Sequence, residues 1–195
     1  MKNSIILFSF YFATAIMFCS CKKDDDDVTK PQVTNENELI TTMKLVMTEA
    51  GNPSHEQVFV SRDLDGTGPG LLTIDTIRLV NGVTYNTEIL LLDETKNPVD
   101  TISKEVEEEG DEHLMILSPT WPADITIIRT DTDVNGVVIG LKSTFKGNAV
   151  TTDKNGKVRI VLKHQGEDKT KDPNVAPDPQ PGTTDIDVHF PVIIQ

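Results

Sequence analysis

Residues 185–194 read Asp-Ile-Asp-Val-His-Phe-Pro-Val-Ile-Ile, and their apolar and polar side chains alternate. Successive side chains of a strand point to opposite faces, so this alternation predicts a half-buried β-strand. The residues expected to face the core are Ile186, Val188, Phe190 and Val192. Pro191 has no N–H to donate, so we expect the strand to lie at a sheet edge or to end early.

Other parts of the chain also have strand patterns. Residues 39–48 place Met43, Leu45 and Met47 on one face, and residues 58–60 form a short apolar run. Three Asn-Gly pairs each lie between β-rich segments, and Asn-Gly is the strongest short hairpin signal. The three predicted hairpins join 72–79 to 84–92, 125–130 to 137–145, and 146–152 to 157–164, through Asn81-Gly82, Asn135-Gly136 and Asn155-Gly156.

One segment departs from this pattern. Residues 98–112 carry Ile102 and Val106 at helical spacing among many acids, with Asp100 or Thr101 as a possible cap. No alternation of strands and helices typical of a parallel sheet is present. The sequence therefore predicts a mainly β fold, a two-sheet antiparallel β-sandwich that is immunoglobulin-like in the broad sense, with one short acidic helix. We expect a single domain over 38–195, with a long Pro-rich loop at 166–184.

The N-terminus predicts export. Lys2 and the apolar run that follows are typical of a signal peptide over residues 1–20. Small residues precede Cys21, which resembles the lipidated cysteine of bacterial lipoproteins, although Phe18 stands where leucine is usual. Residues 21–37 are then a lipidated cysteine and an acidic flexible tether, and the membrane partner is the bilayer that takes up the lipid. The alternative is an ordinary secretory signal.

Cysteine count and charge exclude several classes of function. Cys19 would leave with the signal peptide and Cys21 would carry the lipid, so we expect no disulfide and no thiolate metal site. The net charge of −13 disfavours nucleic acid as a partner. It suits a cation or a basic partner, while solubility alone is the simpler explanation.

An acidic segment with histidines is the candidate metal site. Residues 93–112 hold nine acids and two lysines, a net charge of −7. A helix continuing past Gly110 would place Glu109 and His113 on one face, and His164 ends a predicted strand. Imidazole and carboxylate groups can chelate a divalent transition metal such as zinc. The candidate ligands are His113, His164, Glu109 and Glu112, and the alternative is a solvated acidic surface.

Two further motifs have simpler explanations. Asp131, Asp133 and Asn135 match the opening of a calcium loop, but Lys142 replaces the glutamate expected at the twelfth position. Turns stabilised by Asx side chains are the simpler interpretation. Trp121 lies in a Pro-flanked segment, where it could contact a ligand or close the end of the core.

A set of phrases spread over residues 35–195 resembles a known group. The phrases are Asn35–Thr42, Arg62–Gly66, Glu107–His113, Ile139–Lys142, Leu162–His164 and Thr184–Val188. They are similar to small surface lipoproteins of Bacteroidota that are often found beside TonB-dependent receptors. The acidic run after Cys21 also resembles the surface-export signal of such lipoproteins. Members often carry the label of a type 1 periplasmic-binding fold, an α/β architecture with which this sequence disagrees. The resemblance implies a protein accessory to uptake, with a TonB-dependent receptor as partner.

Known catalytic motifs are absent from the sequence, so we expect no enzyme. The leading hypothesis is a surface-exposed, lipid-anchored outer-membrane protein that binds a nutrient or metal as an accessory to uptake. The alternative is a structural or adhesive module that contacts proteins or glycans through residues 166–184 or Trp121. A hydrolase is a third hypothesis, and it would require a deep pocket with perturbed carboxylates.

Overall fold

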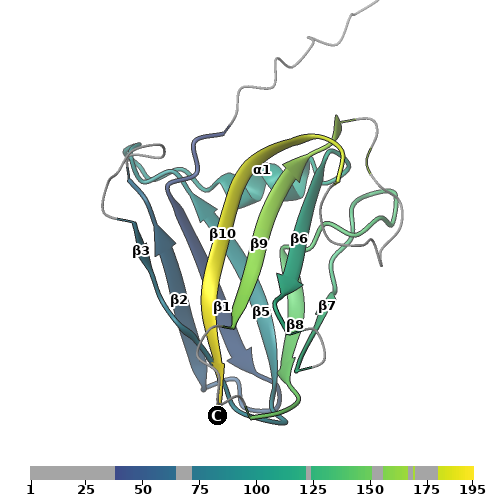
Figure 1. The fold of residues 1–195 in the computed structure, drawn as a ribbon. Helices are drawn as coiled ribbons and strands as arrows, with labels where there is room; N and C mark the ends of the chain where they lie inside the picture. Colours follow the sequence, from purple (N-terminus) through teal and green to yellow (C-terminus); the bar gives the residue numbers. More distant parts are fainter. Residues whose placement is uncertain (1–37, 65–71, 122–123, 151–155, 167–168, 170–179) are drawn as a thin grey trace, which may run out of the picture. The chain divides into compact units, whose positions relative to one another are not determined.

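The computed structural model describes residues 38–64, 72–121, 124–150, 156–166, 169 and 180–195. The described residues belong to one compact unit and form two β-sheets and one helix (Figure 1). The predicted signal peptide, Cys21 and tether lie outside the described residues, as does most of the 166–184 loop. No helix in the described part of the chain has the length and apolarity to cross a membrane.

The larger sheet has six strands in the order β3-β2-β1-β5-β8-β7, and each pairs antiparallel with its neighbour. The strands are β1 (Thr42–Glu49), β2 (Glu56–Arg62), β3 (Thr73–Ile74), β5 (Thr84–Leu92), β7 (Ile125–Arg129) and β8 (Lys142–Gly147). The smaller sheet has the order β4-β10-β9-β6. Its strands are β4 (Ile77–Leu79), β6 (His113–Pro119), β9 (Lys157–His164) and β10 (Thr183–Ile194). The predicted two-sheet sandwich is confirmed, although β4 and β10 pair in parallel.

The core contains the side chains that the alternation predicted. Met43, Leu45 and Met47 of β1 are at most 1% exposed. Phe190 and Val192 of β10 are fully buried within the same cluster. Burying a side chain of this size contributes about 1.5–3 kcal/mol. These two strands therefore hold the two sheets together from opposite sides of the core.

Helix α1 (Ile102–Glu108) is shorter than the sequence predicted. Ile102 and Val106 are buried in the main core as expected, and Thr101 takes the N-cap position without a side-chain cap hydrogen bond. In Figure 1, α1 crosses the end of the sandwich where β6 and β10 begin and β9 ends. The helix stops before Gly110, so the predicted helical pairing of Glu109 with His113 is wrong. His113 instead begins strand β6.

Only one of the three predicted hairpins forms. Strands β7 and β8 pair antiparallel, with Asn135-Gly136 in the connection between them. The strands on either side of Asn81-Gly82 lie in different sheets, as do those on either side of Asn155-Gly156, and Asn155 itself is outside the described residues. Gly82 still adopts a φ of 80°. The motif thus identifies a tight turn, but it does not determine which sheet the next strand joins.

Strand β10 gains a second neighbouring strand directly after Pro191. Within the described residues, β10 pairs only with β9 up to Pro191, and its parallel pairing with β4 begins at Val192. A residue without an N–H is tolerated where one side of the strand has no partner. The predicted edge position is therefore confirmed for the first part of β10, which then becomes an interior strand.

Candidate metal centre

Two histidines meet at the end of the sandwich near α1. His113 begins β6, His164 ends β9, and the two are direct cross-strand partners. Their ring centroids are 4.7 Å apart, with the ring planes at 61°. The chain entering β10 packs against the same place, because a side chain on Gly182 would collide with the His164 carbonyl oxygen. The strand register therefore brings together two residues that are far apart in the sequence.

His113 has the protonation and the free nitrogen that a metal ligand needs. Its side chain is completely buried, and its Nδ1 lies 3.0 Å from the carbonyl oxygen of Glu109. A carbonyl can only accept, so Nδ1 carries the proton and Nε2 carries the lone pair. Nε2 is buried without a hydrogen-bond partner. Burial lowers the pKa of His113 below its usual value, which keeps the ring neutral.

Asp185 supplies a carboxylate that the sequence placed on the wrong face. The β10–β9 register shifts between Thr184 and Ile186, which makes Asp185 the additional residue of a β-bulge. Both of its carboxylate oxygens are buried and have no hydrogen-bond partner. Burial raises the pKa of Asp185 above its usual value, whereas His113 and His164 act in the opposite direction. The alternation predicted Asp185 facing outward, and the bulge redirects it.

These three residues form a compact set of ligands. One ligand atom from each of His113, His164 and Asp185 lies within 4.8 Å of the other two. Ligands around a tetrahedral zinc ion are about 3.3 Å apart, given metal–ligand bonds of about 2.0–2.1 Å. Movements of about 1 Å would therefore close the set around an ion. Two imidazoles and one carboxylate are a donor set typical of zinc and other first-row transition metals.

The two predicted glutamates lie beside this set. Glu112 Oε2 is 3.2 Å from His164 Nε2, which is the position of a carboxylate that orients a ligating imidazole through its other nitrogen. Glu109 belongs to a second set, in which its ligand atom and those of Glu38 and His113 lie within 4.8 Å of one another. The structure thus brings together all four residues that the sequence selected, and it adds Asp185 and Glu38.

Glu38 is the first described residue and was not selected from the sequence. Its Oε2 atom is buried without a hydrogen-bond partner. Burial raises the pKa of Glu38 to about 7, and Glu105, Asp185 and Glu109 add to the effect. No local pattern distinguishes Glu38 from the other acids near the N-terminus, because its surroundings come from distant strands.

The calcium-loop motif is used to stabilise the backbone. The carboxylate of Asp131 accepts hydrogen bonds from the N–H groups of Gly140 and Leu141. Asp133 Oδ1 accepts from Asn135 and Val137. Its Oδ2 lies 2.9 Å from the buried Lys169 ammonium, which also donates to the carbonyl oxygen of Gly110. A cationic lysine at this position disfavours calcium, and Asn135 contributes its main chain to the turn, so the structure favours the Asx-turn interpretation.

Trp121 and the outer face of the smaller sheet are also candidate binding surfaces. Trp121 is partly buried, and its ring lies directly on Gly156, where any side chain would collide with it. This contact favours a packing role for Trp121.

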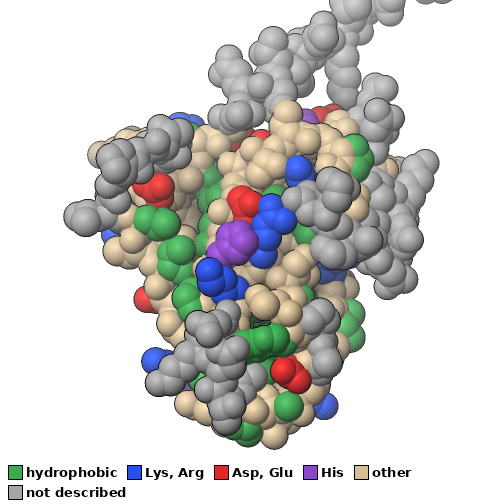
Figure 2. Space-filling model, viewed as in Figure 1, with side chains coloured by type: hydrophobic (Ala, Val, Ile, Leu, Met, Phe, Trp, Pro, Cys, Tyr) green, Lys and Arg blue, Asp and Glu red, His purple; other side chains and the backbone are tan. Residues whose placement is uncertain are grey.

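On the outer face of the smaller sheet, Figure 2 shows charged and histidine side chains gathered together. There Arg159 pairs with Asp187 at 2.6 Å, and His189 lies 3.4 Å from the same carboxylate.

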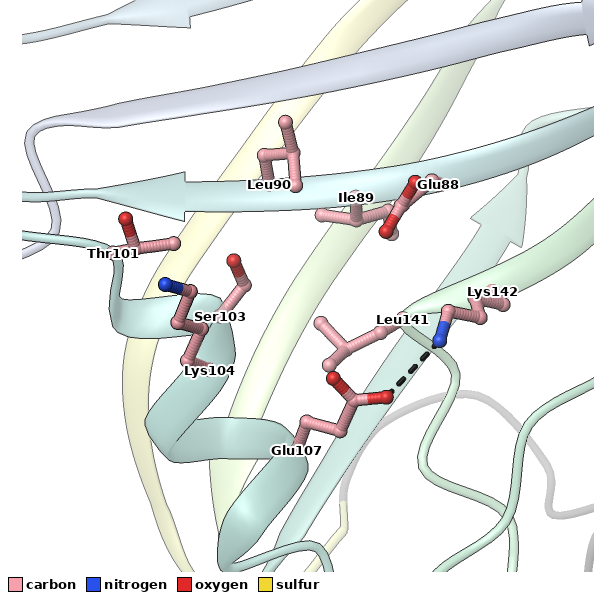
Figure 3. Close-up of a pocket in the computed structure, with 9 residues that line it drawn as sticks. All are labelled: Glu88, Ile89, Leu90, Thr101, Ser103, Lys104, Glu107, Leu141 and Lys142. Carbon is pink, nitrogen blue, oxygen red and sulfur yellow. Dashed lines mark hydrogen bonds and ion pairs between the residues drawn. The ribbon is translucent and has the colours of Figure 1, made fainter.

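A shallow hollow of about 190 Å³ lies between α1 and strands β5 and β8 (Figure 3). Glu107 on α1 and Lys142 on β8 form an ion pair of 3.0 Å across it. None of the residues that line the hollow belongs to either of the histidine–carboxylate sets. The hollow is therefore separate from the candidate metal centre.

Comparison of the chain with protein-family models, with curated proteins and with solved structures finds no match.

Proposed function

We propose that this protein binds a divalent transition metal such as zinc through His113, His164 and Asp185. We further propose that it does so as a non-enzymatic accessory to metal or nutrient uptake, anchored by lipid at Cys21 on the surface of the outer membrane, beside a TonB-dependent receptor. The metal assignment rests on two buried groups of this set that have no hydrogen-bond partner, the Nε2 atom of His113 and the carboxylate of Asp185.

The energetic argument concerns unsatisfied polar atoms. Leaving a buried donor or acceptor without a partner costs about 1–3 kcal/mol. Three such atoms, one on His113 and two on Asp185, occur within one set of ligands. A bound cation would satisfy all three at once, whereas an ordinary core histidine would be expected to have a hydrogen bond on each nitrogen.

The donor types favour one class of metal. Calcium and magnesium prefer oxygen ligands only, whereas imidazole nitrogen suits zinc, copper, iron and nickel. The Glu109 carbonyl and the Glu112 carboxylate lie where they would orient the two rings. The site therefore fits a mixed nitrogen–oxygen ligand set for a transition metal.

Isothermal titration of the purified full-length chain with Zn²⁺ tests this proposal. We expect one ion per chain, and a loss of affinity of at least about 100-fold in His113→Ala and in Asp185→Asn, because each removes a direct ligand. His55→Ala is the matched control, since His55 contacts Glu49 at 2.6 Å on the exposed surface. Equal affinity in all four proteins, or no binding by the unmodified chain, would contradict the proposal.

A further inference from the structure

We propose that Glu38 is an additional ligand of the same metal ion, so that metal binding fixes the junction between the β-sandwich and the chain that precedes it. This inference rests on the proposed metal-binding function. The regulatory consequence is that metal binding would order the segment of the chain that enters the domain at Glu38.

Glu38 and Asp185 both lie close to His113. His113 is the residue shared by the two sets, one with His164 and Asp185 and the other with Glu38 and Glu109. The buried Oε2 of Glu38 has no hydrogen-bond partner. An ion at His113 would therefore have a second unsatisfied carboxylate oxygen within reach, and four ligands would complete a tetrahedral shell.

The surrounding charges favour a cation at this position. The carboxylates of Glu105, Asp185 and Glu109 lie close enough to Glu38 to act on its charge. Like charges gathered in a partly buried space repel one another unless a proton or a cation neutralises them. A divalent ion among these carboxylates would offset this repulsion.

The backbone around Glu38 is held weakly compared with the strand that follows. Thr41 donates its N–H to the carbonyl oxygen of Leu92, and its hydroxyl accepts from the N–H of Glu94. In the described part of the chain, these contacts are the first hydrogen bonds of the segment that leads into β1. Residues 38–40 precede them, with Ile40 buried as an apolar anchor and Leu39 exposed. A metal–carboxylate bond at Glu38 would thus extend the fixed part of the chain by three residues, from Thr41 to Glu38.

Hydrogen–deuterium exchange of the full-length chain, with and without Zn²⁺, tests the inference. The peptide covering residues 36–43 reports on the junction, and a peptide containing His164 reports on the metal centre itself. Glu38→Gln replaces the proposed carboxylate ligand with a neutral amide and keeps the size and shape of the side chain. Glu105→Gln is the matched control, because it removes a charge that acts on Glu38 but no ligand atom.

We expect Zn²⁺ to slow exchange in both peptides of the unmodified chain and of Glu105→Gln. In Glu38→Gln, we expect about tenfold weaker Zn²⁺ binding, slower exchange only around His164, and no protection of the junction. Equal affinity and equal junction protection in Glu38→Gln would overturn the inference and leave the metal site intact. Absence of Zn²⁺ binding in every protein would overturn the proposed function as well. Thermal melts of the metal-free variants check that each is folded.

Discussion

At the scale of single residues, Glu38 has a carboxyl group whose ionisation changes the stability of the metal-free protein. Its pKa rises from 4.5 to about 7 on folding, chiefly through burial. Between these values the folded chain retains a proton that the unfolded chain has lost. The contribution of Glu38 to stability is therefore present below about pH 4.5 and is lost as the pH rises through 7.

Glu38→Gln replaces this carboxyl group with a neutral group of the same shape. We predict that its melting temperature matches that of the unmodified protein near pH 5 and exceeds it by several degrees at pH 8, with both proteins free of metal. Calorimetry across this pH range measures the difference. Glu56→Gln, an exposed substitution on β2, is the control and is expected to show no such trend. A difference that is constant from pH 5 to pH 8 would contradict the raised pKa.

At the scale of structural elements, a buried ion pair stabilises the connection between β7 and β8. Lys169 and Asp133 are 6% and 2% exposed, and their charged atoms lie 2.9 Å apart. Burial alone would raise the pKa of Asp133, but Lys169 and the N–H groups of Val137 and Asn135 outweigh it and lower the pKa. Lys169 also reaches the Gly110 carbonyl, which connects this loop to the turn between α1 and β6.

Lys169→Met should destabilise the fold by about 2 kcal/mol, since it leaves a buried carboxylate oxygen without its charged partner. Urea denaturation measures the change. The double variant with Asp133→Asn should lose less than the sum of the two single variants. Arg159→Met removes the more exposed pair with Asp187 and should cost less than about 1 kcal/mol. Equal losses for Lys169→Met and Arg159→Met would refute the role given to burial.

Local sequence patterns predicted where strands lie and which side chains they bury better than they predicted which strands pair with each other. The alternation in β1 and β10 identified the buried residues because burial on a strand repeats every second position. The Asn-Gly motif requires positive φ, but the choice of sheet depends on contacts with distant strands, so two hairpins were predicted wrongly. His113 and His164 were selected because one directly follows the acidic segment 93–112 and the other ends a predicted strand. Asp185 was missed because a bulge changes the face of a residue without leaving a local signal.

At the scale of the whole molecule, the site depends on the topology of the smaller sheet. The start of β6, the end of β9 and the start of β10 meet at the end of the sandwich that α1 crosses (Figure 1). Each strand contributes one of the proposed ligands there, and Glu38 belongs to the chain leading into β1. Since β1 belongs to the other sheet, an ion held by all four residues would link the two sheets at this end. The net charge of −13 would also favour the approach of a cation.

The most direct test of the central claim is a crystal structure of the Zn²⁺-soaked or co-crystallised protein, with anomalous data collected on both sides of the zinc absorption edge. The account predicts one strong anomalous peak at about 2.0–2.2 Å from His113 Nε2, an imidazole nitrogen of His164 and a carboxylate oxygen of Asp185. A map without a peak at this position, or with peaks only at surface groups such as His55 and Glu49, would contradict it.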